Sequence, residues 1–199
     1  STAELKQYSD VCVTSANAVK IAKALPQKYI FFIPDRNLAH YVAQQVPEKT
    51  FVYNEGYCPV HEKLLTEELK KAKEAHPEAK VLVHPECTQE VCEMADYIGS
   101  TSGIIKYAGE SSAQEFIICT ENGVRFELEK QNPEKTFYFT ETEPVCEDMK
   151  RVTLEKILHV LETGENEVKE LGNQTAPEET MKWAISKQVN IMENRPVIN

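Results

Sequence analysis

The sequence predicts an α/β protein built from tandem three-layer αβα units with short parallel sheets, repeated about a pseudo-threefold axis and followed by C-terminal helices. Three observations lead to this fold class. Short apolar runs alternate with helical patterns, the runs are continuous, and the chain resembles itself at an offset of 86 residues, as from Thr50 to Thr136. Alternation of strands with helices is typical of parallel sheets covered by helices.

The predicted strands are short and rich in β-branched and aromatic residues. Continuous apolar runs indicate strands that are buried on both faces, as in a parallel sheet. The runs cover residues 11–14, 29–33, 50–53, 80–83, 116–119 and 137–139.

Helical patterns lie between these runs, at residues 16–25, 38–46, 64–75 and 88–95. After Cys146 the pattern becomes mostly helical, with helices expected at 153–161 and 178–192 and one short strand near Val168. We expect this C-terminal segment to pack back on the body of the protein.

The internal repeat is clearest where a turn leads into a strand. Residues 45–51 match residues 131–137, since both contain Gln, Pro-Glu-Lys-Thr and Phe in the same places, and residues 30–32 fall on 116–118 without a gap. A common turn before any strand would explain one such match. Agreement over about fifty ungapped residues favours a duplicated unit of about 86 residues.

The repeat divides the chain into three parts. Residues 1–57 are expected to be the remainder of one unit, 58–145 a complete second unit, and 146–199 the helical C-terminal segment. Because Thr2 corresponds to Thr88, the opening of the first unit is expected upstream of Ser1, with a further cysteine about thirty residues before Thr2. The third unit is then mostly missing, and the chain is predicted to be a fragment.

Composition narrows the possible partners. A net charge of −10 argues against nucleic acid, because a phosphate-binding surface needs clustered Lys and Arg. No apolar run is long enough to predict a membrane span, and the N-terminus has no signal-peptide pattern. The expected location is therefore the cytoplasm.

Six cysteines are present without any Cys-x-x-Cys pair. A disulfide framework is not indicated, which leaves buried packing, a catalytic thiol, or ligands gathered from distant positions. Cys58 and Cys146 each follow the end of a repeat unit, where thiolates from three units can converge on an iron–sulfur cluster and leave one iron open. Cys12 and Cys119 lie in apolar runs and Cys92 on a helix face, where packing is the simpler interpretation.

Two turns with small hydroxyl residues occupy equivalent places in the repeat. They contain Ser15 and Thr101, and each connects the end of an apolar run to a helix. Such residues either cap the helix or leave backbone N–H groups to hold an anion, and the sequence leaves both interpretations open. Because open α/β sheets bind ligands at the carboxyl ends of their strands, the duplication favours an anion site.

His84 and Glu86 follow the strand predicted at residues 80–83. An imidazole and a carboxylate two residues apart suit general acid–base chemistry, although a His-Pro-Glu turn before a helix is an equally simple explanation.

The chain resembles the quinolinate synthase family from residue 1 to about 195 in an ordered set of motifs. The motifs are the segment 5–19 with Tyr8-Ser9-Asp10 and Val13-Thr14-Ser15-Ala16-Asn17-Ala18, the segment 33–43 with Pro34-Asp35-Arg36-Asn37, Gly56-Tyr57-Cys58-Pro59-Val60-His61, Val83-His84-Pro85-Glu86-Cys87, the segment 95–103 with Gly99-Ser100-Thr101-Ser102-Gly103, and Cys146-x-x-Met149-Lys150.

The resemblance implies three similar α/β domains around a central [4Fe-4S] cluster that acts as a Lewis acid. It implies condensation of iminoaspartate with dihydroxyacetone phosphate to quinolinate in NAD biosynthesis, with possible functional pairing with L-aspartate oxidase or aspartate dehydrogenase. It further implies that Cys58 and Cys146 are cluster ligands, that Ser15 and Thr101 bind substrate, and that His84 and Glu86 bind substrate and transfer protons. Since the third ligand is expected upstream of Ser1, this chain alone is expected neither to keep a stable cluster nor to turn over.

Two other functions remain as alternatives. One is a scaffold in which Cys58, Cys146 and a third ligand hold zinc structurally. The other is a non-catalytic α/β module that binds small phosphorylated or dicarboxylate ligands.

Overall fold

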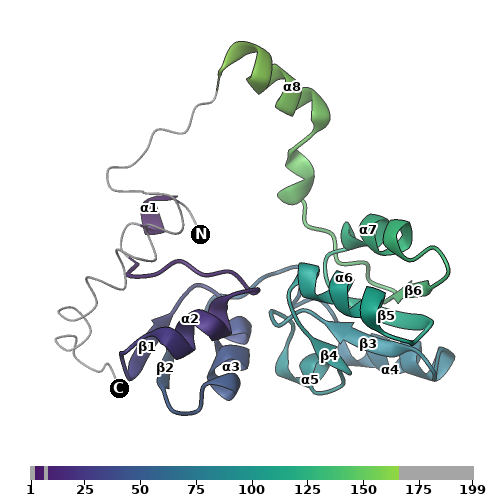
Figure 1. Cartoon of the computed structure of the whole chain (residues 1–199), viewed down its shortest axis with the longest axis horizontal. Coiled ribbons are helices and arrows are strands. Elements are labelled where there is room, and N and C mark those ends of the chain that lie inside the picture. The colour runs from purple at the N-terminus through teal and green to yellow at the C-terminus, as the bar shows by residue number, and fades with distance from the viewer. Residues whose placement is uncertain (1–2, 7–8, 166–199) are drawn as a thin grey trace. The chain divides into compact units, whose positions relative to one another are not determined.

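A computed structural model describes residues 3–6 and 9–165 of the chain. The chain divides into two compact units, one of residues 14–145 and one of residues 1–13 together with 146–199. Each unit is described by itself. The unit of residues 14–145 contains two parallel sheets and the helices that cover them (Figure 1).

The larger sheet has four parallel strands in the order β4-β3-β5-β6. Its strands are β3 (Lys80–Val83), β4 (Tyr97–Ile98), β5 (Glu115–Cys119) and β6 (Thr136–Phe139). The helices that accompany them are α4 (Thr66–Ala75), α5 (Gln89–Cys92), α6 (Thr101–Glu110) and α7 (Val124–Gln131).

The central strands β3 and β5 are buried on both faces, as the continuous apolar runs predict. On one face Val81, Val83 and Ile117 pack in a cluster with residues of α4 and α5. On the other face Leu82 and Phe116 join a second cluster that includes residues of α6 and α7. Because neighbouring strand residues point to opposite faces, these two clusters form the three-layer αβα arrangement that the sequence predicts.

The smaller sheet pairs β1 (Tyr29–Phe32) with β2 (Thr50–Tyr53) in parallel. It is accompanied by α2 (Ala18–Ala24) and α3 (Arg36–Gln45), whose buried residues include Ile21 and Leu38. Asp35 caps α3 by accepting a hydrogen bond from the Leu38 backbone N–H at 2.7 Å. This cap sets the start of α3 at the carboxyl end of β1.

The offset of 86 residues relates hydrogen bonds as well as sequence. Tyr29 pairs with Thr50 in the smaller sheet, and Glu115 pairs with Thr136 in the larger one. Lys49 Nζ donates to the carbonyls of Leu25 and Gln27, and Lys135 Nζ donates to those of Ala108 and Ser111. The two βαβ segments therefore share strand register and a half-buried lysine contact, while the arrangement of three units about an axis stays a prediction.

The structure corrects one strand and adds another. Residues 11–14 form no strand, because the Thr14 backbone N–H donates to Asn17 Oδ1 at 2.7 Å and turns the chain toward α2. Cys12 is therefore not a strand residue. The short strand β4 was not predicted, since two residues carry too little periodicity to reveal it. The helix expected at 178–192 and the strand expected near Val168 lie outside the described residues.

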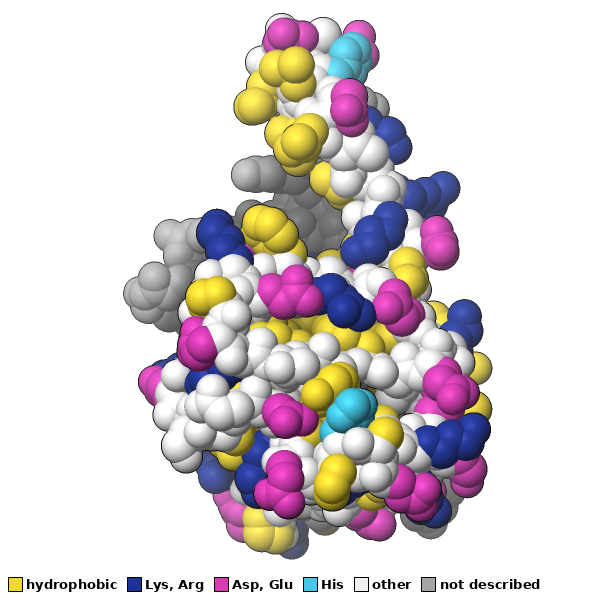
Figure 2. All heavy atoms as spheres, turned by 90° about the vertical axis from the view of Figure 1, so that its right-hand side faces the viewer, with side chains coloured by type: hydrophobic (Ala, Val, Ile, Leu, Met, Phe, Trp, Pro, Cys, Tyr) yellow, Lys and Arg dark blue, Asp and Glu magenta, His cyan; other side chains and the backbone are white. Residues whose placement is uncertain are grey.

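In the second unit the described elements are helices. It contains α1 (Ala3–Lys6), the 3-10 helix η1 (Met149–Arg151) and α8 (Leu154–Thr163), which agrees with the helix predicted at 153–161. Figure 2 shows apolar side chains next to one another on α8. The exposed hydrophobic residues of this helix include Leu154, Leu158 and Leu161. None of the helices in the described ranges has both the length and the apolar character needed to cross a bilayer.

The lysine contact predicts a measurable effect on stability. Replacing Lys135 by Met keeps the apolar stem but removes hydrogen bonds of 2.6 and 2.7 Å to two carbonyls at the end of α6. We expect Lys135→Met to lower the free energy of unfolding by about 1–2 kcal/mol. Urea unfolding measures the effect, with exposed Lys70→Met as the control, and equal midpoints for both variants would contradict it.

Asp96 predicts a pH-dependent contribution to stability. Burial raises the pKa of this carboxyl, but hydrogen bonds from Lys80 Nζ and from the Val81 N–H more than offset burial and hold the pKa below its usual value. A depressed pKa in the folded state means that the contribution is complete above about pH 3.9 and is lost as the pH falls through the folded-state pKa.

We therefore expect Asp96→Asn to lower stability by about 1 kcal/mol at pH 7 and by less at pH 3. Urea midpoints at both pH values measure the difference. Glu110→Gln, on an exposed ion pair with Lys106, is the control. A deficit that stays constant between the two pH values would show that the charge of Asp96 is not responsible.

Candidate functional site

Polar side chains gather at the carboxyl ends of the strands in the unit of residues 14–145. His84 and Glu86 follow β3, and Thr120 follows β5. Cys58 follows β2 in a turn that continues to His61. This edge is where parallel α/β sheets place their ligand sites, because all strand ends and following loops meet there.

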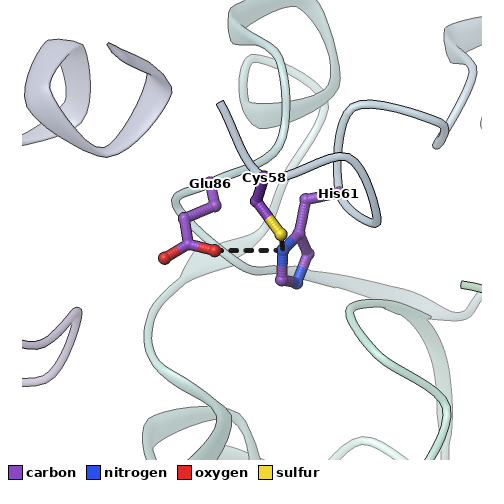
Figure 3. A group of neighbouring side chains, drawn as sticks. All are labelled: Cys58, His61 and Glu86. Carbon is purple, nitrogen blue, oxygen red and sulfur yellow. Dashed lines mark hydrogen bonds and ion pairs between the residues drawn. The ribbon is translucent and has the colours of Figure 1, made fainter. Parts of the chain in front are cut away.

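Cys58, His61 and Glu86 form one compact cluster (Figure 3). His61 Nδ1 lies 3.2 Å from Cys58 Sγ and 3.2 Å from Glu86 Oε2, while His61 Nε2 lies 3.1 Å from Thr120 Oγ1. The Glu62 N–H donates to the Cys58 carbonyl, which makes residues 58–62 one helical turn and puts Cys58 and His61 on the same side. The imidazole of His61 is thus fixed between a thiol, a carboxylate and a hydroxyl.

His84 extends the cluster toward Ser15. Its ring stacks on that of His61 with centroids 4.3 Å apart, and its Nε2 lies 3.2 Å from Ser15 Oγ. The Glu86 backbone N–H donates to His84 Nδ1 at 3.3 Å, so Nδ1 is the acceptor and Nε2 carries the proton that is donated to Ser15. The predicted residues Ser15, His84, Glu86 and Cys58 therefore lie in one continuous set of contacts through His61.

The two stacked imidazoles have opposite electrostatic environments. For His61, burial lowers the pKa, but hydrogen bonds to Cys58 and Glu86 outweigh burial and raise the pKa to about 9. For His84, burial and the nearby charge of His61 lower the pKa to about 4. Burial raises the pKa of Glu86, but the hydrogen bond from the charged His61 opposes burial and brings the pKa below its usual value. At neutral pH the cluster holds a charged His61, an ionised Glu86 and a neutral His84.

Asp35 anchors the turn that carries Cys58. Its Oδ2 accepts the Cys58 backbone N–H at 2.7 Å, while its Oδ1 caps α3. Burial, together with the nearby charge of Glu86, raises the pKa of this carboxyl, although both N–H donors oppose the shift. Gly56 allows this turn to pass close to the backbone of Pro34, because a Cβ at position 56 would lie 2.4 Å from the Pro34 carbonyl oxygen. The position of Cys58 thus depends on the start of α3.

Both hydroxyl turns line the same pocket, which has a volume of about 460 Å³. Ser15 contributes from the first turn, and Ser100, Ser102 and Gly103 contribute from the second, together with Lys106. Thr101 is exposed and does not line the pocket, although it lies between residues that do. Ser100 accepts the Gly103 N–H at 3.2 Å, so capping is its observed role at the start of α6.

The cysteines separate into two kinds. Cys87 and Cys119 are fully buried in the apolar core that also contains Val83, and burial raises the pKa of Cys119 to about 12. Cys92 is half-buried, and burial likewise raises its pKa to about 12. Cys58 and Cys146 are half-buried, and Cys146 belongs to the other unit of the chain.

Sequence reasoning did not assign roles to His61 or Thr120. His61 stands in the motif Cys58-Pro59-Val60-His61, where its spacing of three from a candidate ligand was the available signal. Thr120 gave no signal, because its place beside His61 arises from the pairing of β3 with β5.

The fold and the site together define a parallel α/β protein that collects thiol, imidazole and carboxylate groups at the carboxyl edge of its sheets. Residues 1–192 match the family of Quinolinate synthetase A proteins. The chain belongs to this family.

Curated relatives agree with that assignment. The chain is 44% identical over 191 residues to a quinolinate synthase of Clostridioides difficile (strain 630), covering 96% of this chain and 61% of that protein. It is 50% identical over 161 residues to a quinolinate synthase of Caldicellulosiruptor saccharolyticus, covering 81% of this chain and 53% of that protein. A relative from Aquifex aeolicus is 47% identical, with 84% of this chain and 54% of the relative covered. The chain thus spans between 53% and 61% of the length of these relatives.

The anchoring role of Asp35 can be measured. Asp35→Ala removes the acceptors of the Leu38 and Cys58 N–H groups, so we expect a loss of about 1–2 kcal/mol in the free energy of unfolding and faster hydrogen exchange at the Cys58 amide. Asp35→Asn keeps one acceptor oxygen and should lose less. Urea unfolding and amide exchange test this, and Cys58 exchange unchanged in Asp35→Ala would refute the anchoring role.

Proposed function

We propose that this chain carries part of the active site of a quinolinate synthase, which condenses iminoaspartate with dihydroxyacetone phosphate to quinolinate in NAD biosynthesis. The observation that carries this proposal is the contact of Cys58 and Glu86 with the same imidazole, that of His61, in a member of this family. A candidate cluster ligand and a candidate proton-transfer group thereby lie within one small site.

We further propose that Cys58 and Cys146 are ligands of a [4Fe-4S] cluster. The chemistry of Cys58 fits this role, because its thiol is half-buried and next to an imidazole N–H donor, and hydrogen bonds to sulfur tune such clusters. Cys87 and Cys119 fit poorly, since burial keeps their thiols protonated. When bound, a cluster with one open iron supplies a Lewis acid for a substrate oxygen or nitrogen.

Glu86 is the proposed proton-transfer group. Its carboxylate is ionised at neutral pH and about one quarter exposed, so it can both accept a proton and reach a ligand. His61 holds Oε2 from one side, which orients the carboxylate for transfer.

His84 and Ser15 are the proposed substrate-binding pair. Neutral His84 donates from Nε2 to Ser15 Oγ, which turns the hydroxyl proton of Ser15 away from the imidazole and toward a ligand. The pocket that Ser15 lines also contains Lys106 and the start of α6, which favour the carboxylate and phosphate groups of the proposed substrates. Thr101 is proposed to act at this same helix start.

Iminoaspartate has to be supplied by an enzyme that oxidises aspartate, as L-aspartate oxidase or aspartate dehydrogenase does. Functional pairing with such an enzyme is part of the proposal.

The test uses a full-length protein that carries this chain, reconstituted anaerobically with iron and sulfide. Cys58→Ser and Cys146→Ser should each lose most of the bound iron, sulfide and charge-transfer absorbance. Glu86→Gln should keep them while turnover falls by about 10²–10⁴-fold, because proton transfer is lost and the cluster is not. Cys119→Ser, at a buried position, is the matched control for cysteine replacement.

Full turnover in Glu86→Gln would remove this residue from the mechanism. Bound iron and sulfide that persist in Cys58→Ser and Cys146→Ser would instead overturn the assignment of the ligands.

A further inference from the structure

We propose that Cys58, His61 and Glu86 form a mononuclear site for a divalent transition-metal ion such as Zn²⁺, which this chain binds when no cluster occupies Cys58. The site does not include Cys146 and does not depend on the proposed function. It differs from a structural zinc site shared by Cys58 and Cys146, because all three ligands come from residues 58–86 of one compact unit.

The ligand atoms already have suitable separations. Cys58 Sγ, His61 Nδ1 and one Glu86 oxygen all lie within 4.8 Å of one another, and His61 Nδ1 lies 3.2 Å from both Cys58 Sγ and Glu86 Oε2. Ligands at Zn–S, Zn–N and Zn–O distances of about 2.0–2.3 Å in tetrahedral geometry are separated by about 3.3–3.8 Å. Small side-chain rotations are therefore enough to coordinate an ion, as the converging atoms in Figure 3 illustrate.

The ligand types select a borderline metal. A thiolate, an imidazole and a carboxylate together suit Zn²⁺ or Fe²⁺, whereas Mg²⁺ and Ca²⁺ require oxygen ligands. Thiolate and carboxylate carry two negative charges between them, which a divalent ion neutralises within a half-buried site. Three protein ligands leave the fourth tetrahedral position open to water or another small ligand.

The surroundings of the ligands match those of metal sites. When His61 Nδ1 binds a metal, its Nε2 carries the proton, and the hydroxyl of Thr120 lies 3.1 Å away as the acceptor. Thr120 is only 1% exposed, so this partner is fixed. The Cys58 N–H is held by Asp35 Oδ2, and the Glu86 carbonyl accepts from Asn37 Nδ2 at 3.0 Å. All three ligands are thus oriented by contacts outside the coordination sphere.

An ion can also reach the site. The Glu86 side chain is 24% exposed, and Cys58 is half-buried, while His61 forms the buried wall.

The zinc site and the proposed iron–sulfur cluster exclude each other, because Cys58 is a ligand in both. A protein without its iron–sulfur cluster would then hold a single divalent ion on Cys58, His61 and Glu86. In the cluster-loaded protein, Cys58 is instead the proposed cluster ligand and Glu86 the proposed proton-transfer group.

The test uses the 199-residue chain, purified reduced and anaerobic, stripped with a chelator and titrated with Zn²⁺ alone. We expect one zinc per chain, and with Co²⁺ a thiolate-to-metal charge-transfer band and the intense visible bands of tetrahedral cobalt. Cys58→Ser, His61→Gln and Glu86→Gln should each abolish binding at micromolar zinc. Thr120→Val should weaken it by about 10–100-fold through loss of the His61 partner.

Cys146→Ser and Cys12→Ser are the matched controls and should bind zinc as the unchanged chain does. Circular dichroism checks that each variant is folded, and Glu86→Gln is a near-isosteric change at a partly exposed position. The proposal would be overturned if Glu86→Gln and His61→Gln bound zinc as tightly as the unchanged chain does. It would also be overturned if Cys146→Ser lost zinc binding as Cys58→Ser is expected to.

Failure here is distinguishable from failure of the proposed function. If the 199-residue chain binds no zinc, this proposal fails, while iron and sulfide binding by the full-length protein is a separate measurement that depends on Cys146, a residue that the zinc site does not use.

Discussion

The pairing of β3 with β5 is the constraint on which the candidate site depends. These strands are parallel and in a register that sets Val83 beside Cys119, so their next residues, His84 and Thr120, leave the sheet at the same level. The ladder continues one step further, since the His84 N–H donates to the Cys119 carbonyl at 3.0 Å. His61 then stacks on one of these residues and contacts the other. A shift of one residue in this register would turn His84 into the apolar layer and separate it from Thr120.

The core explains why this register is well determined. Val81, Val83, Ile117 and Cys119 are buried on one face, while Leu82, Phe116 and Ile118 are buried on the other. Since both faces are apolar, a shifted strand would exchange two sets of side chains that fit different helices. The polar residues begin directly where this packing ends, so the rigid part of the sheet supports the residues whose positions matter for chemistry.

Sequence patterns were sufficient for the α/β class, for most strands and for the placement of His84 and Glu86 after a strand. They were insufficient for the strand expected at 11–14, because an extended backbone needs a pairing partner and Asn17 offered the Thr14 N–H a local acceptor instead. His61 and Thr120 are 59 residues apart in sequence, and their contact follows from the tertiary pairing of strands. The shared pocket of the two hydroxyl turns likewise follows from tertiary structure. Their equivalence in the repeat suggested one kind of ligand, but it did not predict that both turns line one pocket. Nor did it predict that Thr101 is exposed while its neighbours line that pocket.

The stacked histidines show how the site divides two tasks between similar groups. Their rings are 4.3 Å apart, so two positive charges there would repel strongly in a buried environment. Glu86 Oε2 lies 3.2 Å from His61 Nδ1 and 3.9 Å from His84 Nδ1, and Cys58 Sγ contacts only the former among these atoms. The proton therefore resides on His61, and burial, together with the charge of His61, lowers the pKa of His84 and keeps it neutral. A positive His61 stabilises anions on the side of the thiol and carboxylate, while a neutral His84 can donate from Nε2 to Ser15. Replacement of the His61 proton by a divalent ion would preserve this division, because the positive charge stays on the same side of the stack.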